Sequence, residues 1–224
     1  MADPLVIRSL EFMGGMATAA GWRPESSGLP EIAFAGRSNV GKSSLLNRLV
    51  RRRAFARVSK TPGRTREINF FRVNGTFVLA DLPGYGYAKV SKTRKAEWRP
   101  LMDGYLRRSP TLRGVVQLLD VRREPTEDDR QMLDFLADVG VPTIVVLTKT
   151  DKVSSRAIAE RVQELCRELG VDEEQIIQFS AVTGAGRDEL AEAMVGLLEG
   201  AVTWERSMQD IAAAGVDGET TPEP

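Results

Sequence analysis

One stretch of eight residues constrains this chain more than any other feature of its sequence. Residues 36–43 read Gly-Arg-Ser-Asn-Val-Gly-Lys-Ser and match the pattern G-x-x-x-x-G-K-S. The apolar segment Ile32–Ala35 precedes them and a helical pattern follows directly, which is the strand–loop–helix setting that a phosphate-binding loop needs. Glycines let backbone N–H groups converge on phosphate oxygens, and the amino end of the helix adds its positive dipole. The sequence therefore predicts a site for a nucleoside triphosphate.

Two side chains of this loop have predicted chemical roles. Lys42 would reach the β- and γ-phosphates, and the hydroxyl of Ser43 would ligate Mg²⁺. The residues predicted to cradle the phosphates are Gly36, Arg37, Ser38, Asn39, Val40, Gly41, Lys42 and Ser43.

The rest of the chain alternates between short apolar runs and longer amphipathic stretches, a pattern typical of alternating strands and helices. Asn74-Gly75 predicts a tight hairpin and therefore one antiparallel strand. Thr126 and Ser154 are the expected amino caps of two helices. The predicted strands are 31–35, 67–73, 76–81, 115–120, 143–147 and 175–179, and the predicted helices are 42–51, 95–107, 126–139, 154–169 and 186–199. We expect an α/β fold, a three-layer sandwich whose mostly parallel six-stranded sheet carries helices on both faces.

Length and composition indicate one domain. The 224 residues, 42% of them apolar, suffice for one substantial core. We expect an amino-terminal extension at residues 1–29, the nucleotide-binding domain at 30–200, and a partly disordered tail at 201–224. The amino end has no signal-peptide pattern, and the apolar runs are too short to cross a bilayer, so we expect no contact with a membrane.

The absence of histidine and the single Cys166 exclude several kinds of chemistry. Imidazole bases, Ser–His and Cys–His nucleophiles and most zinc sites are ruled out. No internal disulfide can form, which fits a reducing cytoplasm. Cys166 lies on an apolar helical stripe and is interpreted as a core thiol.

A second motif, Asp81-Leu82-Pro83-Gly84, follows the apolar strand that ends at Asp81. A carboxylate at a strand's carboxyl end is suited to hold Mg²⁺ through its water shell, and Gly84 can bring its N–H to the γ-phosphate. Between the two motifs lies a loop whose hydroxyl could complete the magnesium site. We favour Thr65 over Thr61, and a plain solvated loop is the alternative. The residues expected to contact the nucleotide here are Gly63, Arg64, Thr65, Arg66 and Glu67.

A third motif predicts which base is bound. Thr148-Lys149-Thr150-Asp151 follows an apolar strand, and a carboxylate at Asp151 can accept from both N1–H and the N2 amino group of guanine. The stem of Lys149 would lie against the base, and Thr148 would fix the loop. Phe179-Ser180-Ala181 would donate backbone N–H groups to guanine O6. Leu82 stands where transport-type ATPases usually carry a catalytic Glu, so guanine is favoured over adenine.

Taken together, these motifs resemble those of the EngB (YihA/YsxC) family of bacterial ribosome-assembly GTPases, which are related to translation factors. The resemblance covers residues 30–200 and is carried by GRSNVGKSSLLNRL from Gly36, SKTPGRT…INFF from Ser59, DLPGYGYA from Asp81 and TKTD from Thr148. It implies the P-loop GTPase fold, binding of GTP and GDP with Mg²⁺ held by Ser43 and Thr65, and hydrolysis of GTP that uses Lys42, Thr65 and Gly84. It also implies a role in large ribosomal subunit assembly and in normal septation and cell division. We expect a monomer.

The sequence leaves open how GTP is hydrolysed. Ras-like GTPases place a glutamine after the D-x-x-G glycine to orient water, and here that position is Tyr85. We therefore expect slow intrinsic hydrolysis, accelerated by a K⁺ ion near Asn39 or by a ribosomal partner. The alternatives are that Asn39 only satisfies loop amides, and that the protein is a nucleotide-gated module for RNA or ribosome binding with negligible hydrolysis.

Charge is distributed unevenly along the chain. Residues 1–113 hold 21 Lys and Arg against 8 Asp and Glu, whereas residues 114–224 hold 10 against 23. The basic residues gather beside both nucleotide-sensing loops, so rRNA of the large-subunit precursor is the expected partner, and a solvated basic face is the alternative. They are Arg48, Arg51, Arg52, Arg53, Arg57, Lys60, Arg64, Arg66 and Arg72, then Lys89, Lys92, Arg94, Lys95 and Arg99.

Overall fold

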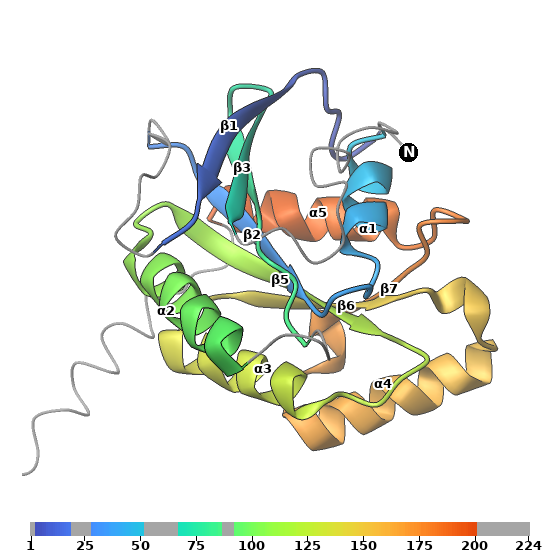
Figure 1. Ribbon diagram of the computed structural model, residues 1–224. Coiled ribbons are helices and arrows are strands. Elements are labelled where there is room, and N and C mark those ends of the chain that lie inside the picture. Colours follow the sequence, from blue (N-terminus) through green and yellow to red (C-terminus); the bar gives the residue numbers. More distant parts are fainter. Residues whose placement is uncertain (1–2, 19–27, 52–66, 87–91, 201–224) are drawn as a thin grey trace, which may run out of the picture.

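The computed structural model of this chain describes residues 3–18, 28–51, 67–86 and 92–200. Within them a seven-stranded sheet has the strand order β1-β3-β4-β2-β5-β6-β7, and helices flank it (Figure 1). The strands are β1 (Leu10–Met16), β2 (Glu31–Gly36), β3 (Ile68–Val73), β4 (Phe77–Asp81), β5 (Leu112–Asp120), β6 (Thr143–Thr148) and β7 (Ile176–Phe179). The helices are α1 (Lys42–Leu49), α2 (Lys92–Arg108), α3 (Glu127–Val139), α4 (Ser155–Leu169) and α5 (Arg187–Leu198), with short 3₁₀ turns η2 (Thr150–Lys152) and η3 (Glu173–Gln175).

Strand directions confirm the predicted mostly parallel sheet. The strands β2, β4, β5, β6 and β7 run parallel to one another, while β3 is antiparallel to both β4 and β1. The Asn74-Gly75 turn joins β3 to β4, and both of its residues have positive φ, as a tight hairpin requires. One strand therefore runs against the rest, as predicted.

The predicted strand number of six is wrong, because β1 adds a seventh strand at the edge beside β3. Its sequence hides it. Gly14 and Gly15 interrupt the apolar pattern, and glycine disfavours strands because it has no side chain to pack. The pairing with β3 shifts register between Phe12 and Gly14, which marks a bulge there. Phe12 nevertheless packs on Phe71 of β3, with ring centroids 5.3 Å apart.

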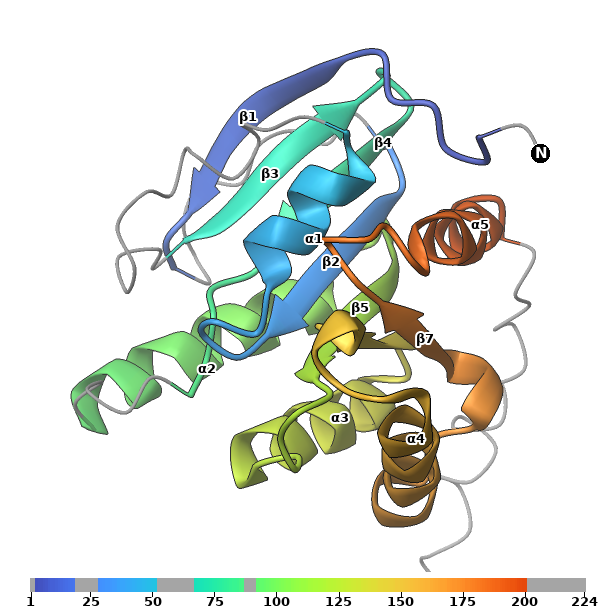
Figure 2. The ribbon, with the colours of Figure 1, turned by 90° about the vertical axis from the view of Figure 1, so that its right-hand side faces the viewer.

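Helices cover both faces of the sheet, as predicted. The helices α1 and α5 lie on one side, and α2, α3 and α4 lie on the other (Figure 2). The first layer packs Leu45, Leu49 and Met194 against the sheet, and the second packs Met102, Met132 and Val162. All six residues of β2 are buried because β2 lies in the middle of the sheet between these layers.

Local capping fixes where the helices on the second face begin. The carboxylate of Asp129 accepts from the backbone N–H of Thr126 at 2.8 Å, and Ser154 accepts from the N–H of Ala157 at 3.3 Å. Both predicted caps are confirmed. Cys166 of α4 is partly buried against the core, in agreement with its predicted packing role. The proposed division into an extension, a domain and a tail stays a prediction, and residues 201–224 lie outside the described part. No helix among the described residues has the length and apolarity needed to cross a membrane.

Candidate functional site

The loops carrying the three motifs leave the sheet at one edge. Parallel strands bring their carboxyl ends together, and the register places Phe34 beside Asp81, Asp120 beside Thr148, and Thr148 beside Phe179. The described residues predicted to bind phosphate, metal and base therefore converge, although Gly36 and Ala181 lie 145 positions apart in the chain.

The phosphate loop turns sharply from β2 into α1. Gly41 has φ +113°, and a Cβ on Gly36 would lie only 2.9 Å from the side chain of Val40, so both positions require glycine. Val40 is buried beneath the loop, and the helix begins at Lys42. Ser43 is exposed on the first turn of α1, where the backbone N–H groups have no partner within the helix.

Lys42 and Asp81 lie together. The Lys42 ammonium donates to the Asp81 carboxylate and to the carbonyl oxygen of Leu82. Only 12% of the Lys42 side chain and 13% of the Asp81 side chain are exposed. The Asp81 carboxylate and the Ser43 hydroxyl are hard oxygen donors, and such a pair beside phosphates is a typical Mg²⁺ setting. No cluster of three or more His, Cys, Asp or Glu side chains that would suit another metal exists among the described residues.

The segment from Asp81 to Tyr85 is bonded to β2 and to the phosphate loop. Leu82 N–H donates to Phe34 O at 3.0 Å, and Ser38 N–H donates to the carbonyl of Tyr85 at 2.8 Å. A Cβ on Gly84 would approach the Ser38 backbone to 3.3 Å, so glycine permits this close packing. Pro83 is buried beside it.

The predicted loop between these motifs falls largely outside the described residues, which exclude Thr61, Gly63, Arg64, Thr65 and Arg66. Their predicted roles stay predictions. Glu67 is described and exposed at the start of β3, and its side chain lies over Gly15 of β1.

The hydroxyl of Thr148 joins the base loop to the phosphate loop and to β5. It lies 2.7 Å from the Val40 carbonyl of the phosphate loop and 3.1 Å from the Leu119 carbonyl of β5, and Thr148 is only 3% exposed. Lys149 has φ +64° and donates to Asn39 O at 2.7 Å. The phosphate loop and the base loop are thereby joined.

The Asp151 carboxylate is held in place by the last predicted segment. Ser180 donates its hydroxyl to Asp151 at 2.8 Å and accepts from the N–H of Thr183 at 3.1 Å, while Lys152 lies 3.1 Å from the second Asp151 oxygen. The hydrogen bond from Ser180 and the Lys152 ammonium lower the pKa of Asp151, so it is ionised at neutral pH. Thr150, Phe179 and Ser180 are buried and Ala181 is partly buried beside them.

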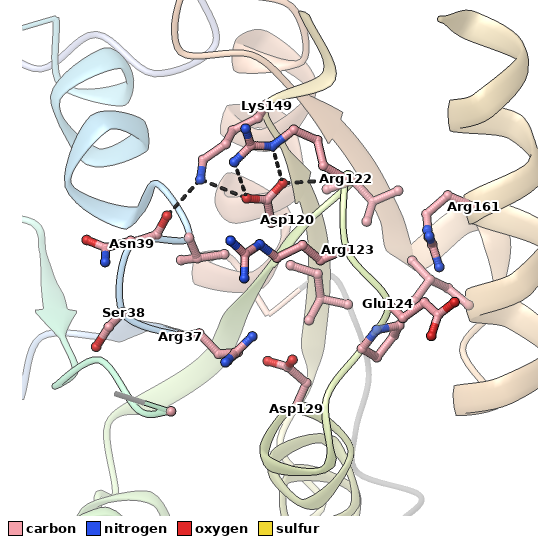
Figure 3. A pocket seen from close by; sticks show the side chains of 16 residues that line it. Arg37, Ser38, Asn39, Asp120, Arg122, Arg123, Glu124, Asp129, Lys149 and Arg161 are labelled. Atoms are coloured by element: carbon pink, nitrogen blue, oxygen red, sulfur yellow. Dashed lines mark hydrogen bonds and ion pairs between the residues drawn. The ribbon is translucent and has the colours of Figure 1, made fainter. Parts of the chain in front are cut away.

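Asp120, at the carboxyl end of β5, is a site residue that the sequence analysis missed. It accepts from Lys149 Nζ at 2.8 Å and from the Arg122 guanidinium at 2.9 and 2.8 Å (Figure 3). Burial raises the pKa of this carboxyl, but the bonds from Arg122 and Lys149 outweigh burial and hold the pKa well below its ordinary value. The signal that identified Asp81, a carboxylate ending an apolar strand, was present here as well.

Arg48 of α1, which the sequence placed in the basic face expected to contact rRNA, makes a contact within the fold that was not predicted. Its guanidinium donates to the carbonyl of Thr183 at 2.9 Å and lies against Gly184, so the helix that follows the phosphate loop also holds the loop between β7 and α5. No sequence pattern announces this contact, which joins residues 135 positions apart.

A pocket of about 440 Å³ lies beside the phosphate loop, on the side facing α3 and α4 (Figure 3). Arg37, Asp120, Asp129 and Arg161 are among its lining residues, but Lys42 and Asp151 are not. The pocket therefore adjoins the convergence of the three motifs and shares Arg37, Ser38, Asn39 and Val40 of the phosphate loop and Lys149 of the base motif with it.

Comparisons with known proteins agree with this geometry. Residues 31–149, just over half of the chain, match the family described as "50S ribosome-binding GTPase", and residues 106–200 match the elongation factor Tu GTP binding domain. A "Probable GTP-binding protein EngB" of Gemmatimonas aurantiaca is 69% identical over 194 residues, 87% of this chain and 95% of that protein. The protein of the same name from Geobacter sp. strain M21 is 49% identical, covering 87% of this chain and 90% of the relative.

Solved structures show the same fold. A crystal structure of a probable GTP-binding protein engB matches with a TM-score of 0.64 and 24% identity over 75% of this chain and 98% of that one. Era of Aquifex aeolicus, bound to GDP and AlF₄⁻, matches with a TM-score of 0.60 and 23% identity over 75% of this chain and 56% of that one. With the motifs converging at one sheet edge and relatives this similar over nearly their whole length, this chain belongs to the EngB family of GTP-binding P-loop GTPases.

Proposed function

We propose that this protein binds GTP with Mg²⁺ and hydrolyses it to GDP and phosphate, and that the change of nucleotide switches its contact with a ribosomal partner. One observation carries the base specificity: the ionised Asp151 carboxylate, held by Ser180, stands at the same edge as Lys42 and Asp81. A fixed carboxylate pairs with two guanine donors, and adenine would leave it unpaired at high cost.

The residues divide the chemistry among them. Lys42 and the backbone amides of the phosphate loop would neutralise the phosphates, while Ser43 would hold Mg²⁺ directly and Asp81 through water. When bound, Mg²⁺ would withdraw charge from the phosphate oxygens. Gly84 offers its N–H to the γ-phosphate, and Thr65 would complete the site.

We expect slow intrinsic hydrolysis. The Tyr85 side chain points into the core, where its hydroxyl donates to Asp129 at 2.8 Å, so Tyr85 does not orient the attacking water. The Asn39 side chain is exposed on the phosphate loop, and we propose it as the position where a K⁺ ion would bind. Turnover in KCl should exceed turnover in NaCl severalfold, whereas equal rates would leave the ribosomal partner as the activator. Negligible hydrolysis under every condition would favour the nucleotide-gated binding module.

We assign the precursor of the large ribosomal subunit as the partner, from the description of the matching family and from the basic first half of the chain. Three of the basic residues have partners within the chain. Arg48 donates to the Thr183 carbonyl, Arg51 forms an ion pair with Asp3, and Arg72 forms an ion pair with Glu11. RNA contacts are therefore assigned to basic residues of 52–66 and 89–99. The structure describes neither residues 52–66 nor 87–91, and of residues 92–99 it describes only the backbone, as the start of α2. Binding should weaken with salt and differ between GTP and GDP. Roles in septation, a cytoplasmic location and a monomeric state stay predictions.

The base specificity is tested by binding assays with GTP, ATP and xanthosine triphosphate. Wild-type protein should prefer GTP over ATP by at least about a hundredfold. In Asp151→Asn the amide can donate to the xanthine O2, so the preference should move from GTP to xanthosine triphosphate. Equal affinity of the wild-type protein for GTP and ATP would refute the proposal.

A further inference from the structure

We propose that Tyr85 is a positioning residue that holds Gly84 against the phosphate loop and so supports the preference for GTP over GDP. This inference rests on the proposed function, in which Gly84 contacts the γ-phosphate. Tyr85 occupies the position of the water-orienting glutamine of Ras-like GTPases. The side chain of Tyr85 is buried in the core and therefore has a different role from that glutamine.

The aromatic ring of Tyr85 is part of the hydrophobic core. Tyr85 is 6% exposed and belongs to the cluster between the sheet and α2 and α3, together with Leu82, Met102 and Met132. A buried ring of this size cannot leave without opening a cavity, so the position of the ring is strongly fixed.

The hydroxyl of Tyr85 connects the nucleotide-sensing segment to helix α3. It donates to Asp129 Oδ1 at 2.8 Å and accepts from the amide of Gln117 on β5. Asp129 is immobilised in turn, because its Oδ2 accepts from the N–H of Thr126 at 2.8 Å and from the Thr126 hydroxyl at 2.6 Å. Burial raises the pKa of the Tyr85 hydroxyl well above its ordinary value, so the hydroxyl remains a donor. The acceptor is thus built into the first turn of a helix and does not depend on a mobile side chain.

The backbone of Tyr85 transmits this restraint to Gly84. Its carbonyl accepts from Ser38 N–H at 2.8 Å, and its N–H donates to Gly36 O at 3.4 Å. Gly84 therefore sits against Ser38 with no room for a side chain. Gly86, the residue after Tyr85, has φ +71°, a conformation in which the chain can turn away from the phosphate loop. A displaced Tyr85 would move the Gly84 amide relative to the phosphate loop.

A displacement of the Gly84 amide would weaken binding only of a nucleotide that carries a γ-phosphate. GDP ends at the β-phosphate, which the loop and Lys42 contact. GTP adds the group that Gly84 receives. Loss of the Tyr85 hydroxyl should therefore weaken GTP binding more than GDP binding.

The test compares Tyr85→Phe with Tyr105→Phe, each as the full-length chain. Tyr105 is a matched control: it is 2% exposed, packs in the same cluster, and its hydroxyl donates to Glu31 at 2.9 Å at the opposite end of β2. Dissociation constants for GDP and for a slowly hydrolysed GTP analogue are measured for each protein. For Tyr85→Phe we expect the analogue to bind about threefold to tenfold more weakly, as the loss of one hydrogen bond allows, with GDP affinity unchanged. Tyr105→Phe should leave both constants unchanged.

The outcomes separate this inference from the proposed function. If wild-type protein fails to bind GTP, the proposed function fails. If wild-type protein binds and Tyr85→Phe keeps the wild-type ratio of the two constants, or both variants shift it equally, the positioning role is overturned. Should Tyr85→Phe not fold, hydrogen exchange of wild-type protein decides. The amides of Leu82 and Tyr85 should then be equally protected with GDP and with the GTP analogue, and loss of protection in either state overturns the inference.

Discussion

The Thr148 hydroxyl bridges two loops and supplies the first prediction at the scale of single residues. It shares one hydrogen between the Val40 and Leu119 carbonyls, and a Thr148→Val substitution keeps the shape but leaves both buried acceptors without this donor. We expect the free energy of unfolding to fall by about 1–3 kcal/mol, measured by urea denaturation, and GDP affinity to fall with it.

Thr143 opens the same strand and gives the control for that experiment. Its hydroxyl donates to Val141 O at 3.0 Å in a partly exposed setting. Thr143→Val should change the free energy of unfolding by less than about 0.5 kcal/mol. Equal effects of the two substitutions would contradict a special role for Thr148.

The second residue-scale prediction concerns Asp120 and pH. Its folded-state pKa lies below the ordinary value of 3.8, so its contribution to stability is present above that value and is lost as the pH falls toward the folded-state pKa. Asp120→Asn should lower the free energy of unfolding by about 2–3 kcal/mol at pH 7. The difference from wild type should shrink as the pH falls below about 4. Urea denaturation at pH 7, 5 and 3.5 measures it, and a difference that stays constant with pH would count against the assignment.

Single residues of the site were predictable only where a motif carries them. Lys42, Asp81 and Asp151 stand in patterns whose spacing suits phosphate, metal and base, so sequence alone could propose them as site residues, and their roles stay predictions. The fixing role of Thr148 followed from its position in such a motif. The contact of Arg48 with Thr183 could not be predicted, because it depends on how α1 packs beside a distant loop. The inward direction of Tyr85 likewise depends on Asp129 and Gln117, which no local pattern links to it.

Secondary-structure elements were predictable where periodicity and caps agree. The strand before the phosphate loop and the helices after Thr126 and Ser154 appear within one residue of their predicted starts. The strand β5 begins at Leu112, three residues before its predicted start. The prediction began too late because Arg113 and Gly114 interrupt the apolar pattern there. The edge strand β1 was missed for the same kind of reason, since Gly14 and Gly15 conceal it.

Two glycines at helix ends give a prediction at the scale of elements. Gly186 precedes α5 with φ +74°, and an added Cβ would collide with the carbonyl oxygen of Gln178. Gly170 follows α4 with φ +63° and open space around it. Gly186→Ala should lower the free energy of unfolding by more than about 3 kcal/mol, because it adds a backbone clash to the strain. Gly170→Ala should cost only about 1 kcal/mol from the left-handed conformation. Thermal or urea unfolding compares them, and similar costs would show that the loop before α5 relaxes freely.

At the scale of the whole molecule, the amino-terminal segment is tied to the end of the fold. The Arg187 side chain on α5 is 6% exposed, pairs with Asp3, and donates to Leu5 O at 2.8 Å and Leu49 O at 3.3 Å. One guanidinium therefore joins the beginning of the chain, α1 and α5. Composition could not predict this, because it distinguishes a basic first half from an acidic second half without saying which charges meet.

Removing this guanidinium should loosen the whole assembly. Arg187→Ala removes the donor to the Leu5 and Leu49 carbonyls and leaves the Asp3 carboxylate with Arg51 as its remaining guanidinium partner, so we expect a loss of about 2–4 kcal/mol in the free energy of unfolding. Arg156→Ala is the control, because its ion pair with Glu160 lies at the surface, with the Arg156 side chain 89% exposed, and should contribute less than about 0.5 kcal/mol. Urea denaturation of both variants decides. If the two losses are equal, the amino-terminal segment is held by β1 pairing alone. If Arg187→Ala lowers the free energy of unfolding much more than Arg156→Ala does, the ends of the fold are stabilised through this one side chain.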